Sequence, residues 1–85
     1  MATGTLTTNT TTDEVRLVRP HIHLSGTFGS GTIKFQFQDD NGTWRDIAGA
    51  SYTSATDIIL DFRRAVTIRG SLSGATAPSL VWVIN

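Results

Sequence analysis

Few side chains in this 85-residue chain could do chemistry, and the first of them are two closely spaced histidines. His21 and His23 form a His-x-His pair. On a strand, residues at i and i+2 project from the same face, at a spacing that suits one metal ion. A metal site needs further ligands, and the chain has no third histidine. We therefore expect a solvated strand face, with a metal shared around the axis of a symmetric trimer as the alternative.

The acidic candidates lie in the stretch "FQFQDDNGTWRDI". Asp39, Asp40 and Asn41 suggest either a calcium loop or a tight turn. Calcium takes about six to eight oxygen ligands from a longer series of residues. By contrast, Asn-Gly supplies the positive φ angles of a type I′ turn, and aspartate favours the start of a turn. The pattern therefore predicts a hairpin turn built from Asp39, Asp40, Asn41 and Gly42 and covered by Trp44.

Trp44 and Tyr52 flank predicted loops and are the only aromatic residues placed to form a stacking platform for a sugar ring. Packing against the hairpin is the simpler prediction for Trp44. The chain has no Gly-x-Ser-x-Gly elbow, no phosphate loop, no dinucleotide fingerprint and no cysteine. We therefore predict a protein that binds without catalysis, is not an enzyme and needs no cofactor.

Composition limits the classes of partner. Seven Lys/Arg balance seven Asp/Glu, so no net field draws the chain to nucleic acid or to an anionic membrane. The longest apolar run, residues 80–84, is far below the roughly 20 residues that span a bilayer. No basic-then-apolar signal sequence is present, and we expect use without Sec export. A chain this short buries only about 60–65% of its unfolded surface, so self-association or docking on a larger body is expected.

The elements that must position these residues follow a period of two from Asp13 onward. The clearest segment, "TIKFQFQ", alternates apolar and polar side chains, and the segments around it are short and separated by Gly, Pro, Ser and Asn. In the last segment, "SLVWVIN", Val81 and Val83 indicate that both faces are covered. No stretch has helical period. The pattern predicts an all-β fold, a small antiparallel β-sandwich or partly open barrel of about six to eight short strands over residues 13–85.

Residues 1–12 differ from the rest, because seven of them are threonine and Leu6 is the only large apolar side chain after Met1. No period in this segment could bury a face, so we expect an extended, flexible N-terminal arm. Such an arm either stays free or becomes ordered on a partner. The candidate partner contacts are the middle of this arm and the only basic doublet, namely Thr5, Leu6, Thr7, Thr8, Arg63 and Arg64.

The order of two longer stretches carries a family resemblance. "SGTFGSGTIKFQFQDDNGTWRDIAGASYT" is followed, after one alternating strand, by "TIRGSLSGATAPSLVWVIN". A Gly-rich turn, a strand ending in Asp, a hairpin with Trp, an Ile-x-Gly-Ala loop and a terminal Ser-Gly-Ala-Thr-x-Pro-Ser-Leu strand follow one another over residues 25–85. In this order they resemble the short β-sandwich virion structural proteins of tailed bacteriophages.

The resemblance implies a non-catalytic virion protein, made in the host cytoplasm and located in the virion. The first expectation is a capsid decoration (cement) protein that bridges capsid subunits and stabilises the shell. The alternatives are a tail, fibre or head–tail adaptor component, or a carbohydrate-binding module at a fibre tip. The implied partners are the major capsid protein or another virion protein, with a homo-oligomer, either trimer or dimer, and with neither nucleic acid nor membrane.

Overall fold

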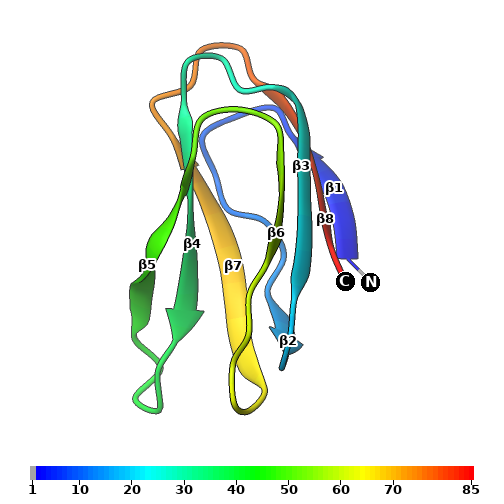
Figure 1. Cartoon of the computed structure of the whole chain (residues 1–85). Helices are drawn as coiled ribbons and strands as arrows, with labels where there is room; N and C mark the ends of the chain where they lie inside the picture. Colours follow the sequence, from blue (N-terminus) through cyan, green and yellow to red (C-terminus); the bar gives the residue numbers. More distant parts are fainter. Residues whose placement is uncertain (1) are drawn as a thin grey trace.

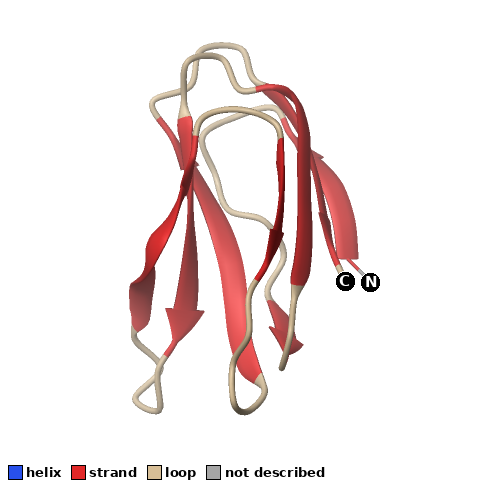
Figure 2. Ribbon diagram, viewed as in Figure 1, coloured by secondary structure: helices blue, strands red, loops and turns tan. Residues whose placement is uncertain are grey.

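The computed structural model describes residues 2–85 and confirms the all-β prediction. Two four-stranded antiparallel sheets face each other as a β-sandwich, and the described chain contains strands and loops only (Figures 1 and 2). Within residues 2–85 there is no helix of the length and apolarity needed to cross a membrane. The strands are β1 (Ala2–Leu6), β2 (Val15–Leu17), β3 (His21–Thr27), β4 (Thr32–Gln38), β5 (Trp44–Tyr52), β6 (Thr56–Ile59), β7 (Val66–Ser73) and β8 (Ser79–Ile84).

The strand orders are β1-β8-β3-β6 in one sheet and β2-β7-β4-β5 in the other. Strands next to each other in a sheet are mostly distant in sequence, since β8 pairs with β1 on one side and β3 on the other. In this sheet Gly4 lies opposite Trp82, and Trp82 lies opposite Leu24. The loops β4–β5 and β6–β7 lie at the same end of the sandwich (Figure 1).

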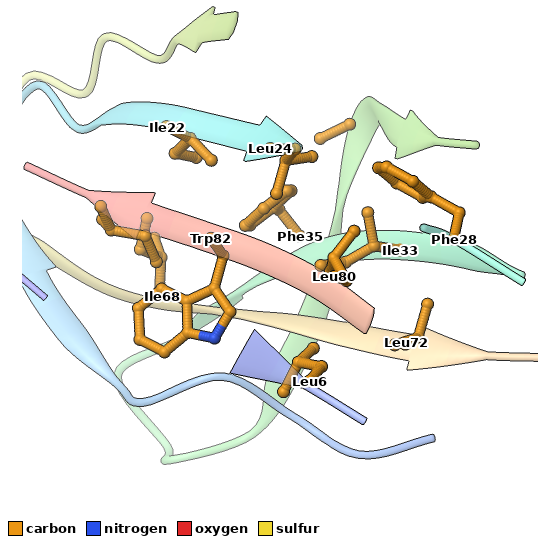
Figure 3. Close-up of a cluster of buried hydrophobic side chains, with 12 residues drawn as sticks. Leu6, Ile22, Leu24, Phe28, Ile33, Phe35, Ile68, Leu72, Leu80 and Trp82 are labelled. Carbon is orange, nitrogen blue, oxygen red and sulfur yellow. The ribbon is translucent and has the colours of Figure 1, made fainter. Parts of the chain in front are cut away.

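The core lies between the sheets and is built by the predicted alternation of apolar side chains. Ile22, Leu24, Ile33 and Phe35 are buried, and their side chains lie in the space between the two layers (Figure 3). Each buried Leu, Ile or Phe side chain contributes about 1.5–3 kcal/mol relative to exposure. The remaining core residues are Leu6, Phe28, Ala50, Ile68, Leu72, Leu80, Trp82 and Ile84.

The prediction of an extended, flexible arm outside the domain at residues 1–12 is wrong for residues 2–12, which pack on the sandwich, and residue 1 lies outside the described residues. Residues Ala2–Leu6 are an edge strand of the sandwich, paired with β8 along their whole length. Leu6 is only 5% exposed and belongs to the core. Gly4 packs closely on Trp82, because a Cβ there would lie 3.0 Å from the Trp82 ring, a tighter contact than most Cβ atoms make. The formation of this strand therefore depends on pairing with β8, at the other end of the chain.

The segment that follows β1 crosses from one sheet to the other and is held by hydrogen bonds to β7. The Thr10 carbonyl accepts the Leu72 N–H at 2.9 Å, and the Thr12 N–H donates to the Gly70 carbonyl at 2.8 Å. The buried Thr12 hydroxyl accepts the Gly70 N–H at 2.9 Å. The Asn9 side chain bonds the backbone of Ala75 twice, as donor and as acceptor. The two backbone bonds form an isolated antiparallel bridge between Thr11 and Ser71, and the Thr12 hydroxyl adds a side-chain bond to it.

We predict that Leu6→Ala destabilises the domain by about 2–4 kcal/mol, the range for truncating a buried leucine. The free energy of unfolding would be measured by urea denaturation, followed by tryptophan fluorescence and circular dichroism. Thr7→Ala is the matched control, because Thr7 is exposed and surface changes stay within about 0.5 kcal/mol. Equal stabilities of the two variants would contradict the placement of β1 in the core.

We also predict that Thr12→Val destabilises the domain by about 1–3 kcal/mol, because the Gly70 N–H loses a buried acceptor without loss of side-chain volume. Thr12→Ser keeps the hydroxyl and loses one methyl group, worth about 0.8 kcal/mol. The same denaturation measurement compares the two. A valine variant as stable as the serine variant would show that the hydroxyl does not hold the crossing segment.

Candidate functional site

The β4–β5 hairpin is closed by the carboxylate of Asp39. One oxygen of Asp39 accepts the N–H groups of Asn41 and Thr43, each at 2.9 Å, and the other accepts Nε of Arg45 at 2.7 Å. The Asp39 carbonyl accepts the Gly42 N–H at 3.0 Å. The hydrogen bond from Arg45, followed by the backbone bond from Thr43, lowers the pKa of Asp39 below its usual value. Both oxygens of this carboxylate are therefore engaged in forming the turn.

The hairpin turn lies where the sequence predicts it, but the predicted type I′ geometry is wrong. Type I′ requires positive φ at both central residues, and Asn41 is not among the positive-φ residues, whereas Gly42 has φ of 81°. The bonds instead describe a three-residue loop, in which a turn with negative φ at its centre is followed by a left-handed glycine. The Asp39 side chain makes this geometry favourable because it accepts the N–H groups of Asn41 and Thr43.

Neither acidic nor histidine candidates assemble into a metal centre within residues 2–85. Asp40 pairs with Arg64 at 3.3 Å at the exposed tip of the hairpin. His21 and His23 do share a face, as predicted, with ring centroids 4.2 Å apart, and His23 Nδ1 lies 2.7 Å from the carboxylate of Asp57. No group of three or more His, Cys, Asp or Glu side chains in the described chain is placed to hold a metal ion.

The sequence predicts that Trp44 covers the hairpin. In the structure Trp44 lies on the outer face of the β2-β7-β4-β5 sheet, at the start of β5. Its ring reaches toward β7, and the guanidinium carbon of Arg69 lies 4.1 Å from the ring centroid. Arg69 Nε donates to the Gln36 side chain at 3.0 Å, and Gln36 in turn donates to Asp46 at 2.9 Å. This chain of bonds across three strands holds the arginine over the tryptophan, so the cation already occupies one face of the ring.

Trp44 and Tyr52 do not form the sugar-stacking platform that was the alternative for them. Both have even numbers on one strand, which in a regular strand puts them on one face. β5 is irregular: between the pairs Gln36↔Asp46 and Lys34↔Ser51, two residue steps on β4 are matched by five on β5. The three extra residues on β5 are an odd number, so side chains after the irregularity point to the opposite face from the one their numbering would predict. Tyr52 therefore lies opposite the core residue Ile33. Its ring lies 6.3 Å from that of Phe35, on the core side.

A shallow polar depression of about 240 Å³ lies between the β4–β5 hairpin and the β6–β7 loop. Arg16, Asp39, Asp40 and Arg64 line it. The volume is below the range of about 300–1,000 Å³ typical of small-molecule sites, and its charges are of both signs. Arg64 and its neighbour Arg63 are exposed here, and an exposed ion pair such as Arg64–Asp40 contributes little to stability.

The outer face of the other sheet, which we name the β8 face, is different in character. Its central strand carries Val81, which is 38% exposed, and the half-buried Val83. The edge strand β6 adds Ile59, which is 65% exposed. The prediction that both sides of β8 are covered is therefore wrong within this chain. The remaining outward side chains of this face are Thr3, Thr5, His21, His23, Ser25, Thr27, Asp57 and Ser79.

The partner contacts predicted from the sequence separate into two places. Thr5 lies exposed on β1, next to the β8 face, and Thr7 and Thr8 are exposed in the bend that follows it. Leu6 is buried and is not available for a partner. The basic doublet, residues 63–64, lies in the β6–β7 loop, away from this segment. The β8 face itself was missed because alternation alone does not say whether an apolar outward residue is covered.

Comparison of the chain with protein-family models, with curated proteins and with solved structures finds no match.

We predict that Asp39 makes hairpin stability depend on acid pH. Because its folded-state pKa is lowered, its stabilisation is complete above the unfolded aspartate pKa of about 3.9 and is lost as pH falls through the folded value. The Asp39→Asn variant should be less stable than wild type at pH 7, with a gap that narrows toward pH 2. Urea denaturation at both pH values measures this gap.

Asp40→Asn is the matched control for this prediction. Asp40 accepts a single bond from an exposed arginine, so its substitution should change stability much less at pH 7. A gap between wild type and the Asp39 variant that stays the same at pH 7 and pH 2 would contradict the role given to this carboxylate.

Proposed function

We propose that this chain is a non-catalytic structural protein of a tailed-phage virion that acts as a capsid decoration protein. The observation that carries the proposal is the β8 face, an open sheet surface with apolar side chains at its centre. Together with the resemblance over residues 25–85, this face favours a role in which a protein partner covers the sheet. The partner we propose is the major capsid protein.

The two outer faces of the sandwich differ in charge, and this difference supports the β8 face as the docking face. The β8 face carries one acidic side chain, Asp57 at its edge strand, besides the two histidines. The opposite face carries Arg16, Lys34, Asp46 and Arg69. The centres of protein–protein interfaces are depleted of charged residues, and burying an unpaired charge is costly. A protein partner is therefore accommodated on the β8 face at lower cost.

A decoration role also suits the energetics of the domain. A small chain with a marginal core gains stability when a partner binds only its folded form. Burying Val81, Val83 and Ile59 on a capsid surface adds apolar contact area at each copy, and many copies repeated over a shell add these contacts together. In this mechanism the protein bridges neighbouring capsid subunits and resists their separation, without any chemical step.

A tail, fibre or head–tail adaptor role uses the same face and differs only in copy number. A carbohydrate-binding role is less well supported, because Arg69 lies over Trp44 and Tyr52 packs on the core side of β5. Quantitative mass spectrometry of purified virions separates the two structural roles. A copy number in fixed ratio to the capsid protein supports decoration, a few copies support the adaptor role, and absence contradicts both.

The docking face is tested with purified particles that lack this protein. We predict that Val81→Glu lowers its affinity for such particles at least about tenfold, equivalent to about 1.4 kcal/mol, because a carboxylate would be buried at the centre of the interface. Ser54→Glu, in the exposed β5–β6 loop, is the control with the same charge change. Co-sedimentation measures both, and circular dichroism checks that both are folded. Equal binding of the two variants would contradict the β8 face as the docking surface.

A further inference from the structure

The outer edge of β1 differs from the other three sheet edges in lacking any protection against pairing with another strand. An edge strand presents unpaired N–H and C=O groups, and natural proteins guard it with charge, proline, bulges or short length. β1 is five residues long and reads Ala-Thr-Gly-Thr-Leu. It contains no charged residue and no proline, and its register with β8 is continuous from Ala2 to Leu6.

Each of the other edges carries at least one protective device. β2 has only three residues, with Arg16 at its centre. β5 has the register shift described above and a left-handed Gly49 with φ of 75°. β6 has four residues and includes Asp57, which pairs with His23. The unguarded edge is therefore confined to one position in the sandwich, at its lateral limit beside β8 (Figure 1).

The sequence of β1 can pair with itself in an antiparallel register, and this favours a second copy of the chain as its partner. In an antiparallel pair centred on Gly4, Ala2 lies opposite Leu6 of the second copy and Thr3 lies opposite Thr5 of the second copy. Opposed residues lie on the same face of a sheet, so core-side apolar residues meet each other and outward threonines meet each other. Cross-strand threonine pairs are favourable in sheets. Any alternating strand would match the facing, but a second copy also places a threonine opposite each outward threonine of β1.

We propose that β1 pairs with β1 of a second copy about a twofold axis at Gly4. The sheet then continues from one protomer into the other as β6-β3-β8-β1 followed by the same four strands in reverse order. The arrangement is isologous, since the same edge is used on both sides and no edge of this kind remains. The chain has no net charge, so long-range repulsion between copies does not oppose the pairing.

The pairing has a consequence for the β8 face. Thr3 and Thr5 border Val83 and Val81 in the cross-strand register, so joining two β1 edges places two β8 faces side by side on one continuous sheet. A twofold dimer thus presents twice the low-charge surface to a larger body. The dimer itself forms in solution without any other protein, so its test is independent of the proposed virion role.

The experiment uses charge reversal on the full chain. In the double variant T3E/T5E, each introduced carboxylate lies opposite another across the twofold axis, and like charges directly opposite are destabilising. The double variant T3K/T5K has the same effect with the opposite sign. Thr3 and Thr5 are exposed, but the Thr3 hydroxyl donates to the Trp82 carbonyl at 2.9 Å, so circular dichroism checks that both variants keep the sandwich. T53E/S54E, in the exposed β5–β6 loop, is the control with equal charge to the acidic variant.

Sedimentation velocity over a concentration series measures the mass of each protein. We expect wild type and T53E/S54E to approach twice the 9.2 kDa chain mass, each β1 variant alone to stay at the single-chain mass, and the equimolar mixture of acidic and basic variants to recover the twofold mass. A wild type that stays monomeric at all concentrations would overturn the proposal. This outcome includes the case in which β1 pairs only with a strand of another protein. So would a dimer that persists in T3E/T5E, or a mixture that stays monomeric.

Discussion

The position of β8 at the centre of its sheet is the constraint on which the rest of the structure depends. β8 is the last strand of the chain, yet it pairs with β1 and β3 and carries Trp82 into the core. β1 and β3 do not pair with each other. β8 lies between them and joins them into one sheet. The pairings it makes are highly non-local, and such topologies fold slowly because loop-closure entropy is lost before contacts form.

Two features of the sequence make this closure favourable. Gly4 removes the side chain that would meet the Trp82 ring, so that β1 can pack on the largest residue of the core. The threonine-rich segment then carries the chain to the second sheet and satisfies backbone groups of β7 with its own backbone and with the hydroxyl of Thr12. Buried polar groups are costly unless hydrogen-bonded. These bonds therefore allow the chain to cross between the sheets without leaving those backbone groups unpaired.

Alternating segments from residue 13 onward could be recognised from the sequence, and they account for the sheet fold and most of the core. Three features could not. The role of residues 2–6 depends on a partner strand about 80 residues away, and one leucine gives no period. The reversed facing of Tyr52 depends on the bulge in β5, since a change of one residue in register exchanges the faces. The turn type depends on the Asp39 side chain, whose bonds compete with the type I′ geometry that Asn-Gly favours.

Several polar side chains of this chain hold its own loops and strands together. Asp39 holds a turn, Asp46 and Gln36 hold Arg69, and Asp57 pairs with His23, so the polar groups that could bind a metal or a sugar are already engaged with one another. A side chain held in this way has less to offer a ligand, because binding would first break the existing bonds. The edge of β1 and the face of β8 offer backbone groups and apolar surface instead. Both favour another protein, since a strand can complete the first and a flat apolar surface can cover the second.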